Sequence, residues 1–251
     1  MRTQKLLILL LGLFVMNNSF AQTLPPVESV GIGGFKKGAG HLGLTSFNPI
    51  TYRNVLLFVN RDHKNEINDK FYESVSGSPY ISDNFLPAKV NDFKEVISAR
   101  YNAYKDLITI KIGDSRAFFL QKKAGNKLTF ANNRGTYQVF YDQGEEVKFF
   151  KVLKSTKFYS LLIKQEVQLV GGEKPKNDYD KYIAPYFRRN KDKLYLSLDN
   201  VRAVKIPSNK KKFFKLFEDE EEKIKAYVKK HRLSVKKEED LIKILMYYES
   251  L

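Results

Sequence analysis

The chain has 251 residues, with 44 Lys and Arg against 28 Asp and Glu, a formal net charge of +16 and no cysteine. The missing cysteine excludes disulfides, thiol nucleophiles and cysteine-bound zinc, so an ordinary hydrophobic core must stabilise the fold. The length fits one sizeable domain, or one domain with a smaller appendage.

The N-terminus has the pattern of a secretory signal peptide. Arg2 and Lys5 precede an apolar run over residues 6–16, and Ser19 and Ala21 are the small residues expected before a cleavage site. The run is shorter than the roughly 20 residues of a membrane-spanning helix. We expect export to the periplasm or the medium after cleavage near Ala21, which leaves 251 − 21 = 230 residues. An N-terminal membrane anchor is the alternative.

The mature chain remains strongly basic. Removal of Arg2 and Lys5 lowers the net charge by two, from +16 to +14, because residues 1–21 contain no acid. An exported protein with this charge meets lipopolysaccharide phosphates, anionic lipid head groups and acidic glycans, and we expect no nucleic-acid partner. The lysines are spread along the chain, so a solvated basic surface is the alternative interpretation.

Residues 22–70 are predicted to be a glycine-rich leader and a loop, partly flexible. The leader contains GAGHLG over residues 38–43, which matches the G-x-G-x-x-G pattern, but Pro49 prevents the early helix that a nucleotide site requires. NVLLFVN over residues 54–60 predicts a short strand. The stretch 62–69 has oxygen ligands but lacks the spacing of a calcium-binding loop, so we expect no metal there.

Residues 71–206 are predicted to form an antiparallel β domain. Apolar and polar residues alternate from 97 to 103 and from 108 to 112, with a turn at Lys105-Asp106. Further β runs separated by turn residues continue to Val170, and two more strands follow the predicted surface loop over 171–182. We expect an antiparallel meander that forms a curved sheet or a partly open barrel. An outer-membrane barrel is the structural alternative.

Residues 207–251 are predicted to form two helices packed on the β domain, which makes the fold mainly β in an α+β arrangement. In the second helix Leu241, Ile244 and Leu245 share one face. Ser234 is placed to be the N-cap of that helix.

No catalytic constellation is recognised. A serine triad needs a histidine base, and the three histidines of the chain lie in polar stretches. A glycosidase needs two carboxylates, one of them in an apolar pocket, and Asp178, Asp180 and Asp199 fit turns and caps instead. We therefore expect a non-enzymatic protein without a metal or a cofactor.

The candidate binding residues are Arg100, Asn102 and Tyr104, in the stretch ARYNAYKDLITIKI over residues 99–112. Tyr101 and Ala103 are expected on the inward face of a strand, and Arg100 and Asn102 on the opposite face. If that face lines a cavity, these side chains suit an anionic or hydroxylated ligand. A solvated strand face is the alternative.

Three stretches resemble, in order, a β-rich family of exported Gram-negative proteins that has a C-terminal helical segment and no assigned function. They are GSPYISDNFLPAKV, ARYNAYKDLITIKI and the ending LFEDEEEKIKAYVKKHRLSVKKEEDLIKILMYYESL. The likeness covers roughly residues 77–251. It implies export and a β-rich fold, and it brings no catalytic residues.

Three functions follow from these observations. We expect an exported, non-catalytic envelope protein that binds a protein partner or an anionic surface polymer, with no transmembrane segment in the mature chain. A lipocalin-like carrier of a lipophilic ligand is the first alternative, because the meander is rich in aromatic residues. A carboxylate-dependent hydrolase is the second. Oligomeric state is left open.

Overall fold

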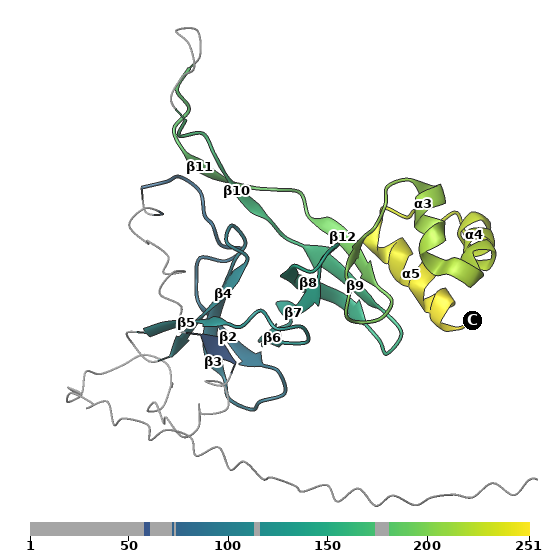
Figure 1. Cartoon of the computed structure of the whole chain (residues 1–251), viewed down its shortest axis with the longest axis horizontal. Coiled ribbons are helices and arrows are strands. Elements are labelled where there is room, and N and C mark those ends of the chain that lie inside the picture. The colour runs from purple at the N-terminus through teal and green to yellow at the C-terminus, as the bar shows by residue number, and fades with distance from the viewer. Residues whose placement is uncertain (1–57, 61–71, 73, 113–115, 174–180) are drawn as a thin grey trace, which may run out of the picture. The chain divides into compact units, whose positions relative to one another are not determined.

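The structure is a computed structural model that describes residues 58–60, 72, 74–112, 116–173 and 181–251 (Figure 1). All of them belong to one compact unit, residues 44–251. The predicted signal peptide, its cleavage near Ala21 and most of the predicted leader and loop over 22–70 lie outside the described residues. Within the described ranges, no helix has both the length and the apolar character needed to cross a membrane.

The described residues form thirteen strands in two antiparallel sheets (Figure 1). Eleven strands form the larger sheet in the order β1-β5-β4-β3-β2-β6-β7-β8-β9-β12-β13, and β10 and β11 pair separately. The bounds are β1 Val59–Asn60, β2 Leu86–Val90, β3 Ile97–Asn102, β4 Leu107–Ile112, β5 Arg116–Leu120, β6 Lys127–Phe130, β7 Gly135–Tyr141, β8 Val147–Ser155, β9 Ser160–Lys164, β10 Val167–Val170, β11 Tyr186–Arg189, β12 Lys193–Ser197 and β13 Val204–Lys205.

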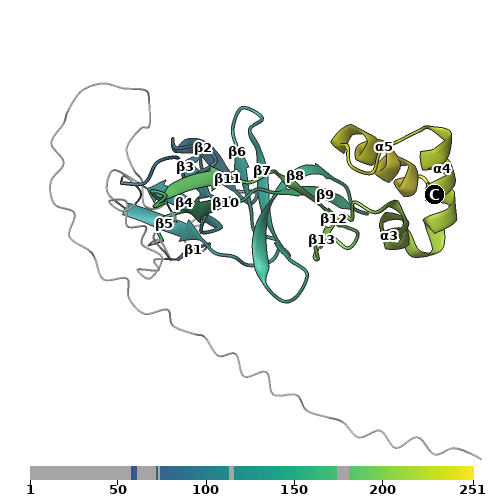
Figure 2. The ribbon, with the colours of Figure 1, turned by 90° about the horizontal axis from the view of Figure 1, so that it is seen from above.

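The larger sheet is open and does not close into a barrel. β1 and β13 stand at the two ends of its strand order. Figure 2 shows the strands from above. Neighbouring strands follow the chain order as a meander with three exceptions: β1 pairs with β5, β2 pairs with β6, and β9 pairs with β12. The predicted mainly β, antiparallel fold is therefore confirmed in its open form.

The β3–β4 hairpin has the predicted alternation. Ala99 pairs with Ile110 and Tyr101 pairs with Ile108, and all four side chains are buried. The turn uses a left-handed residue, Asp106, with φ of 54°. Aspartate tolerates this conformation better than most residues, because its short polar side chain bonds locally.

The stretch KFYSLLIKQEVQLV over residues 157–170 is divided between two strands. β9 ends at Lys164, and β10 begins at Val167 and pairs with β11, a strand that the sequence analysis missed. The backbone N–H of Asn190 donates to the Glu166 carbonyl oxygen at 2.9 Å, which joins the β9–β10 junction to the end of β11. Three consecutive polar residues, Lys164, Gln165 and Glu166, interrupt the apolar alternation at this junction, a signal that the sequence analysis passed over.

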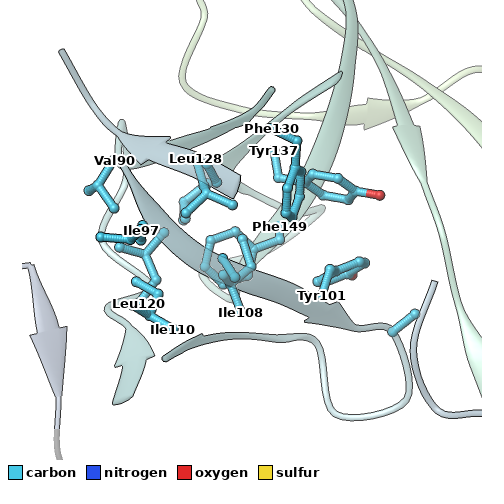
Figure 3. Packing of buried hydrophobic residues seen from close by; sticks show 14 of the residues in the cluster. Val90, Ile97, Tyr101, Ile108, Ile110, Leu120, Leu128, Phe130, Tyr137 and Phe149 are labelled. Atoms are coloured by element: carbon cyan, nitrogen blue, oxygen red, sulfur yellow. The ribbon is translucent and has the colours of Figure 1, made fainter. Parts of the chain in front are cut away.

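Buried side chains form three clusters: one centred on β2 to β8, a second where the sheet meets the helices, and a third that contains Phe150. Figure 3 shows part of the first cluster, in which Tyr101, Tyr137 and Phe149 lie together. Phe149 and Phe150 are neighbours in β8 and both are fully buried. Adjacent strand residues point to opposite faces, so the sheet is covered on both sides at this point.

Four helical segments follow the sheet: α3 Lys210–Phe214, the 3₁₀ segment η2 Lys215–Glu220, α4 Glu221–Lys230 and α5 Glu238–Glu249. The first predicted helix is thus divided, and Glu218, with φ of 43°, marks the kink. Phe213, Ile224 and Leu241 pack in one cluster with Leu161 of β9 and Leu196 of β12.

The predicted N-cap at Ser234 is wrong. The helix begins later and Lys237 occupies the N-cap position. Asp240, in the first turn, instead accepts a hydrogen bond from the backbone N–H of Ser234 at 2.9 Å. This bond holds the segment before the helix in a turn, and Val235 in that segment is buried. The helix therefore begins only at Glu238.

Candidate functional site

Arg100, the first predicted binding residue, is packed against aromatic rings. Its guanidinium carbon lies 3.7 Å from the centre of the Tyr80 ring and 4.5 Å from that of Phe85. Its Nη1 donates to the Asp83 carbonyl oxygen at 3.2 Å. The planar guanidinium stacks well on aromatic faces. These contacts give Arg100 a role in fixing the segment that precedes β2.

Asn102, the second predicted residue, is fully buried, which corrects the expectation that it lies on a solvated strand face. Its side-chain oxygen accepts hydrogen bonds from the backbone N–H groups of Tyr104 at 3.1 Å and Lys105 at 2.8 Å. Asparagine often closes a turn in this way. Tyr101 and Asn102 are adjacent at the end of β3 and both are buried, so the sheet is covered on both faces there.

Tyr104, the third predicted residue, lines a polar cleft of about 410 Å³, whereas Arg100 and Asn102 do not. We call this site the polar cleft. Four lysines, three carboxylates and five neutral residues line it. They come from the β3–β4 turn, the segment after β5, the start of β8, the β9–β10 junction and the end of β11. They are Ala103, Tyr104, Lys105, Asp106, Lys122, Glu146, Lys148, Lys164, Glu166, Val167, Gln168 and Asn190.

A buried ion pair forms the base of the polar cleft. The Lys164 ammonium lies 2.6 Å from Asp106 Oδ1, and only 4% of the Lys164 surface is exposed. The same nitrogen donates to the Phe149 carbonyl oxygen at 2.9 Å and to the Tyr101 hydroxyl at 3.4 Å. An ammonium has three N–H groups, so every donor of Lys164 has an acceptor.

Asp106 is the centre of this network. Its Oδ1 accepts from the Tyr101 hydroxyl at 2.7 Å, and its Oδ2 lies 2.9 Å from the Lys122 ammonium. The Phe149 backbone N–H also points to Oδ2 at 3.4 Å. One carboxylate therefore bridges two lysines, a tyrosine and strand β8.

Burial determines how these groups titrate. Burial lowers the pKa of Lys164, although Asp106 acts in the opposite direction. Burial also raises the pKa of Tyr101 well above its ordinary value, and Asp106 adds to that rise. The pKa of Tyr137 is raised for the same reason of burial. Both tyrosines thus remain hydroxyl donors in neutral solution.

The carboxylates of the polar cleft are each held in an ion pair. Glu146 lies 3.0 Å from Lys148, Glu166 contacts Lys193, and Asp106 has its two lysines. A general acid needs a carboxyl group that remains protonated, usually in an apolar pocket. The arrangement suits rigid positioning of charges better than proton transfer to a substrate.

A second hollow, the basic groove, lies between α3 and α4 and has a volume of about 400 Å³. Its seven lining residues are four cations, Lys210, Lys225, Lys229 and Arg232, and three buried apolar residues, Phe214, Val228 and Leu233. No acidic residue lines it. All four cationic residues are exposed.

The local sequence explains how the basic groove forms. After α4 the Leu233 N–H donates to the Val228 carbonyl oxygen at 3.0 Å, and the Arg232 N–H donates to that of Lys229 at 3.3 Å. This pair of bonds is the Schellman motif, which places a left-handed residue after the helix and brings two apolar residues together. Arg232 holds that position with φ of 54°. The motif thereby sets Val228 and Leu233 in the floor and Arg232 at the rim.

The sequence analysis found one residue of the polar cleft, Tyr104, and missed the others. The cleft depends on Lys164 and Val167 meeting the β3–β4 turn, about sixty residues earlier, and no local pattern indicates such a contact. The sequence analysis named none of the four cations of the basic groove as a candidate binding residue. The signal available in the sequence was the pair Val228 and Leu233. Apolar residues at this spacing across a helix end are typical of the Schellman motif.

Comparison with protein-family models, curated proteins and solved structures finds no match to this chain. In the part of the chain that the structure describes, no group of three or more His, Cys, Asp or Glu side chains is arranged to hold a metal ion.

Proposed function

We propose that this protein is an exported, non-catalytic envelope protein that binds an anionic surface polymer through the basic groove. The observation that carries the proposal is the lining of the groove, where four cations surround an apolar floor without an acid. Phosphate or carboxylate groups of a polymer are the complementary ligands.

Two features favour an anion in this groove. Of the four cations, Lys225 has a described ion pair, with Glu222 at 3.2 Å, and that glutamate side chain is 81% exposed. An exposed pair of this kind contributes little and is readily exchanged. The apolar floor of Phe214, Val228 and Leu233 also keeps water away from one side of a bound anion, which strengthens each charge interaction.

The contacts inside the polar cleft favour a non-catalytic role. Its lysine with a lowered pKa, Lys164, has all three donors engaged by Asp106, Phe149 and Tyr101. A lysine nucleophile must present a free amine to a carbonyl group. Opening this network would leave Asp106 without its nearest counter-ion.

Binding of the mature chain to lipopolysaccharide and to anionic phospholipid vesicles, across a salt series, tests the proposal. We expect affinity to fall steeply with salt, because screening weakens exposed charge pairs. Neutralising two groove lysines together, Lys225→Gln and Lys229→Gln, should weaken vesicle binding about 30-fold, from roughly 1 kcal/mol for each charge near the surface.

The matched control is Lys89→Gln with Lys154→Gln, which removes the same charge from two exposed strand positions. The control variant should bind nearly as well as the parent. If both double variants lose affinity equally, net charge alone governs binding and the groove is not the site. If binding does not respond to salt, the proposal is wrong.

A further inference from the structure

We propose that the polar cleft is a second binding site, and that its ligand is a neutral, hydroxyl-rich glycan segment. The inference does not depend on the basic groove, because different residues line the two sites. The volume of about 410 Å³ falls within the range of small-ligand sites.

The balance of charge in the polar cleft argues against a polyanion. Four lysines face three carboxylates in the lining, and Lys148 also lies 2.9 Å from Asp142, just outside it. The hydrogen bonds and charges of Asp142 and Glu146 raise the pKa of Lys148 against the effect of burial. Three of the four lysines, Lys122, Lys148 and Lys164, are already paired with carboxylates, so an incoming polyanion would have to compete with internal carboxylates for them. The fourth, Lys105, lies 5.2 Å from the centre of the Tyr104 ring.

Hydrogen-bonding groups of both kinds remain for a ligand. Among the described residues, no hydrogen bond involves the Tyr104 hydroxyl or the side-chain amide of Asn190, and both residues line the cleft. The carboxylates of Glu146 and Glu166 each keep further lone pairs beyond their ion pairs. A sugar hydroxyl both donates and accepts, so it fits this mixture of donors and acceptors better than a purely anionic group does.

The cleft is also rigid. The buried tie between Lys164 and Asp106 fixes the β3–β4 turn, and the Val167 N–H donates to the Ala103 carbonyl oxygen at 3.2 Å across the cleft base. The Tyr104 ring packs at 5.3 Å, centre to centre, against Phe187 of β11. A preformed polar site loses little conformational freedom on binding.

The test is a titration of the isotope-labelled mature chain with two neutral probes, maltohexaose and the tetramer of N-acetylglucosamine, followed by amide NMR shifts. We expect shifts at residues 103–106, 166–168 and 190, with no shift in α4. Salt should change the affinity little, because neutral ligands are not screened. Tyr104→Phe and Asn190→Ala should each weaken binding about 2- to 10-fold, as expected for a lost hydrogen bond.

Lys225→Gln in the basic groove is the control and should leave glycan binding unchanged. Two results would overturn the inference. One is that neither neutral probe shifts the cleft amides at the highest soluble concentration. The other is that polygalacturonate, an acidic glycan, shifts these amides while the neutral probes do not. Loss of vesicle binding in the groove variant without loss of glycan binding separates this inference from the proposed function.

Discussion

Lys164 and Asp106 are 58 residues apart in the sequence, and their side chains meet at 2.6 Å beneath the polar cleft. The contact joins the end of β9 to the β3–β4 turn, while Tyr101 and Phe149 hold the same two groups from the core. The position of this ion pair determines the shape of the polar cleft, because its two residues are part of the lining.

The two partners of this ion pair should differ in their effect on stability. Asp106→Asn leaves a buried ammonium without its nearest counter-ion, so we expect the free energy of unfolding to fall by about 3 kcal/mol. Asparagine tolerates the positive φ of position 106, which removes backbone strain as an explanation. Lys164→Met should cost only about 1 kcal/mol, because Asp106 keeps Lys122 and the Tyr101 hydroxyl.

Denaturant unfolding measures both changes. Lys122→Ala is the control, since its side chain is 26% exposed, and its loss should cost less than about 1 kcal/mol. If Asp106→Asn and Lys122→Ala lower the free energy of unfolding equally, the buried pair does not contribute more to stability than the exposed one.

The stability of the fold should decrease in strongly alkaline solution. The pKa values of Tyr101 and Tyr137 are raised from 10.0 by burial, so above pH 10 the unfolded chain releases protons that the folded chain keeps. Stability is therefore lost as the pH rises beyond that point. The lowered pKa of Lys164 acts in the opposite sense, and stability from this residue rises with pH up to its ordinary value of 10.5.

Urea unfolding at a series of pH values above 10 checks this expectation. Tyr137→Phe removes one titrating hydroxyl. Above pH 10 the free energy of unfolding of this variant should therefore fall less steeply than that of the parent, by about 1.4 kcal/mol for each pH unit. The parent and the variant should have parallel pH profiles below pH 9. A parent whose stability is unchanged between pH 10 and pH 12 would be inconsistent with buried, protonated tyrosines.

The Arg232 side chain should strengthen binding to anionic vesicles, whereas its left-handed backbone should lower the free energy of unfolding. Its left-handed backbone, with φ of 54°, is a conformation that glycine adopts without strain. We expect Arg232→Gly to raise the free energy of unfolding by about 1 kcal/mol while weakening binding to anionic vesicles. Thermal unfolding and vesicle sedimentation on the same samples measure the two effects. If Arg232→Gly binds vesicles as tightly as the parent, Arg232 is not part of the binding site.

Arg100 should act in folding alone. Arg100→Lys keeps the charge but loses the planar stacking on Tyr80 and Phe85, so we expect a loss of stability of about 1 kcal/mol. Vesicle binding and glycan binding should not change, because Arg100 lines neither site. If Arg100→Lys binds vesicles or glycan more weakly while its stability is unchanged, Arg100 is a ligand-binding residue.

Much of the fold was predictable because its signals are local. Period-two alternation and turn residues located the hairpin of β3 and β4, and the spacing of Leu241, Ile244 and Leu245 located α5. The division between β9 and β10 was missed, because the polar residues from Lys164 to Glu166 were taken as part of one continuous strand. What turns the chain there is the contact of Glu166 with Asn190 and Lys193, which only the tertiary structure brings close.

The sites were less predictable than the elements. Strand alternation assigned Asn102 to the outer face, but its side chain closes the turn and is buried. Lys164 was one lysine among many in the sequence, and only its distance from Asp106 distinguishes it. The basic groove arises at a helix end, where Arg232 takes a backbone conformation that sequence patterns assign to glycine.

The most direct test of an anion-binding role is a titration of the isotope-labelled mature chain with soluble polyphosphate, followed through the backbone amides. We expect the amides of Lys225, Val228 and Lys229 to shift at low salt and high salt to abolish these shifts. The amides of the polar cleft should not respond. Shifts spread over all exposed lysines, or confined to the polar cleft, would contradict this expectation.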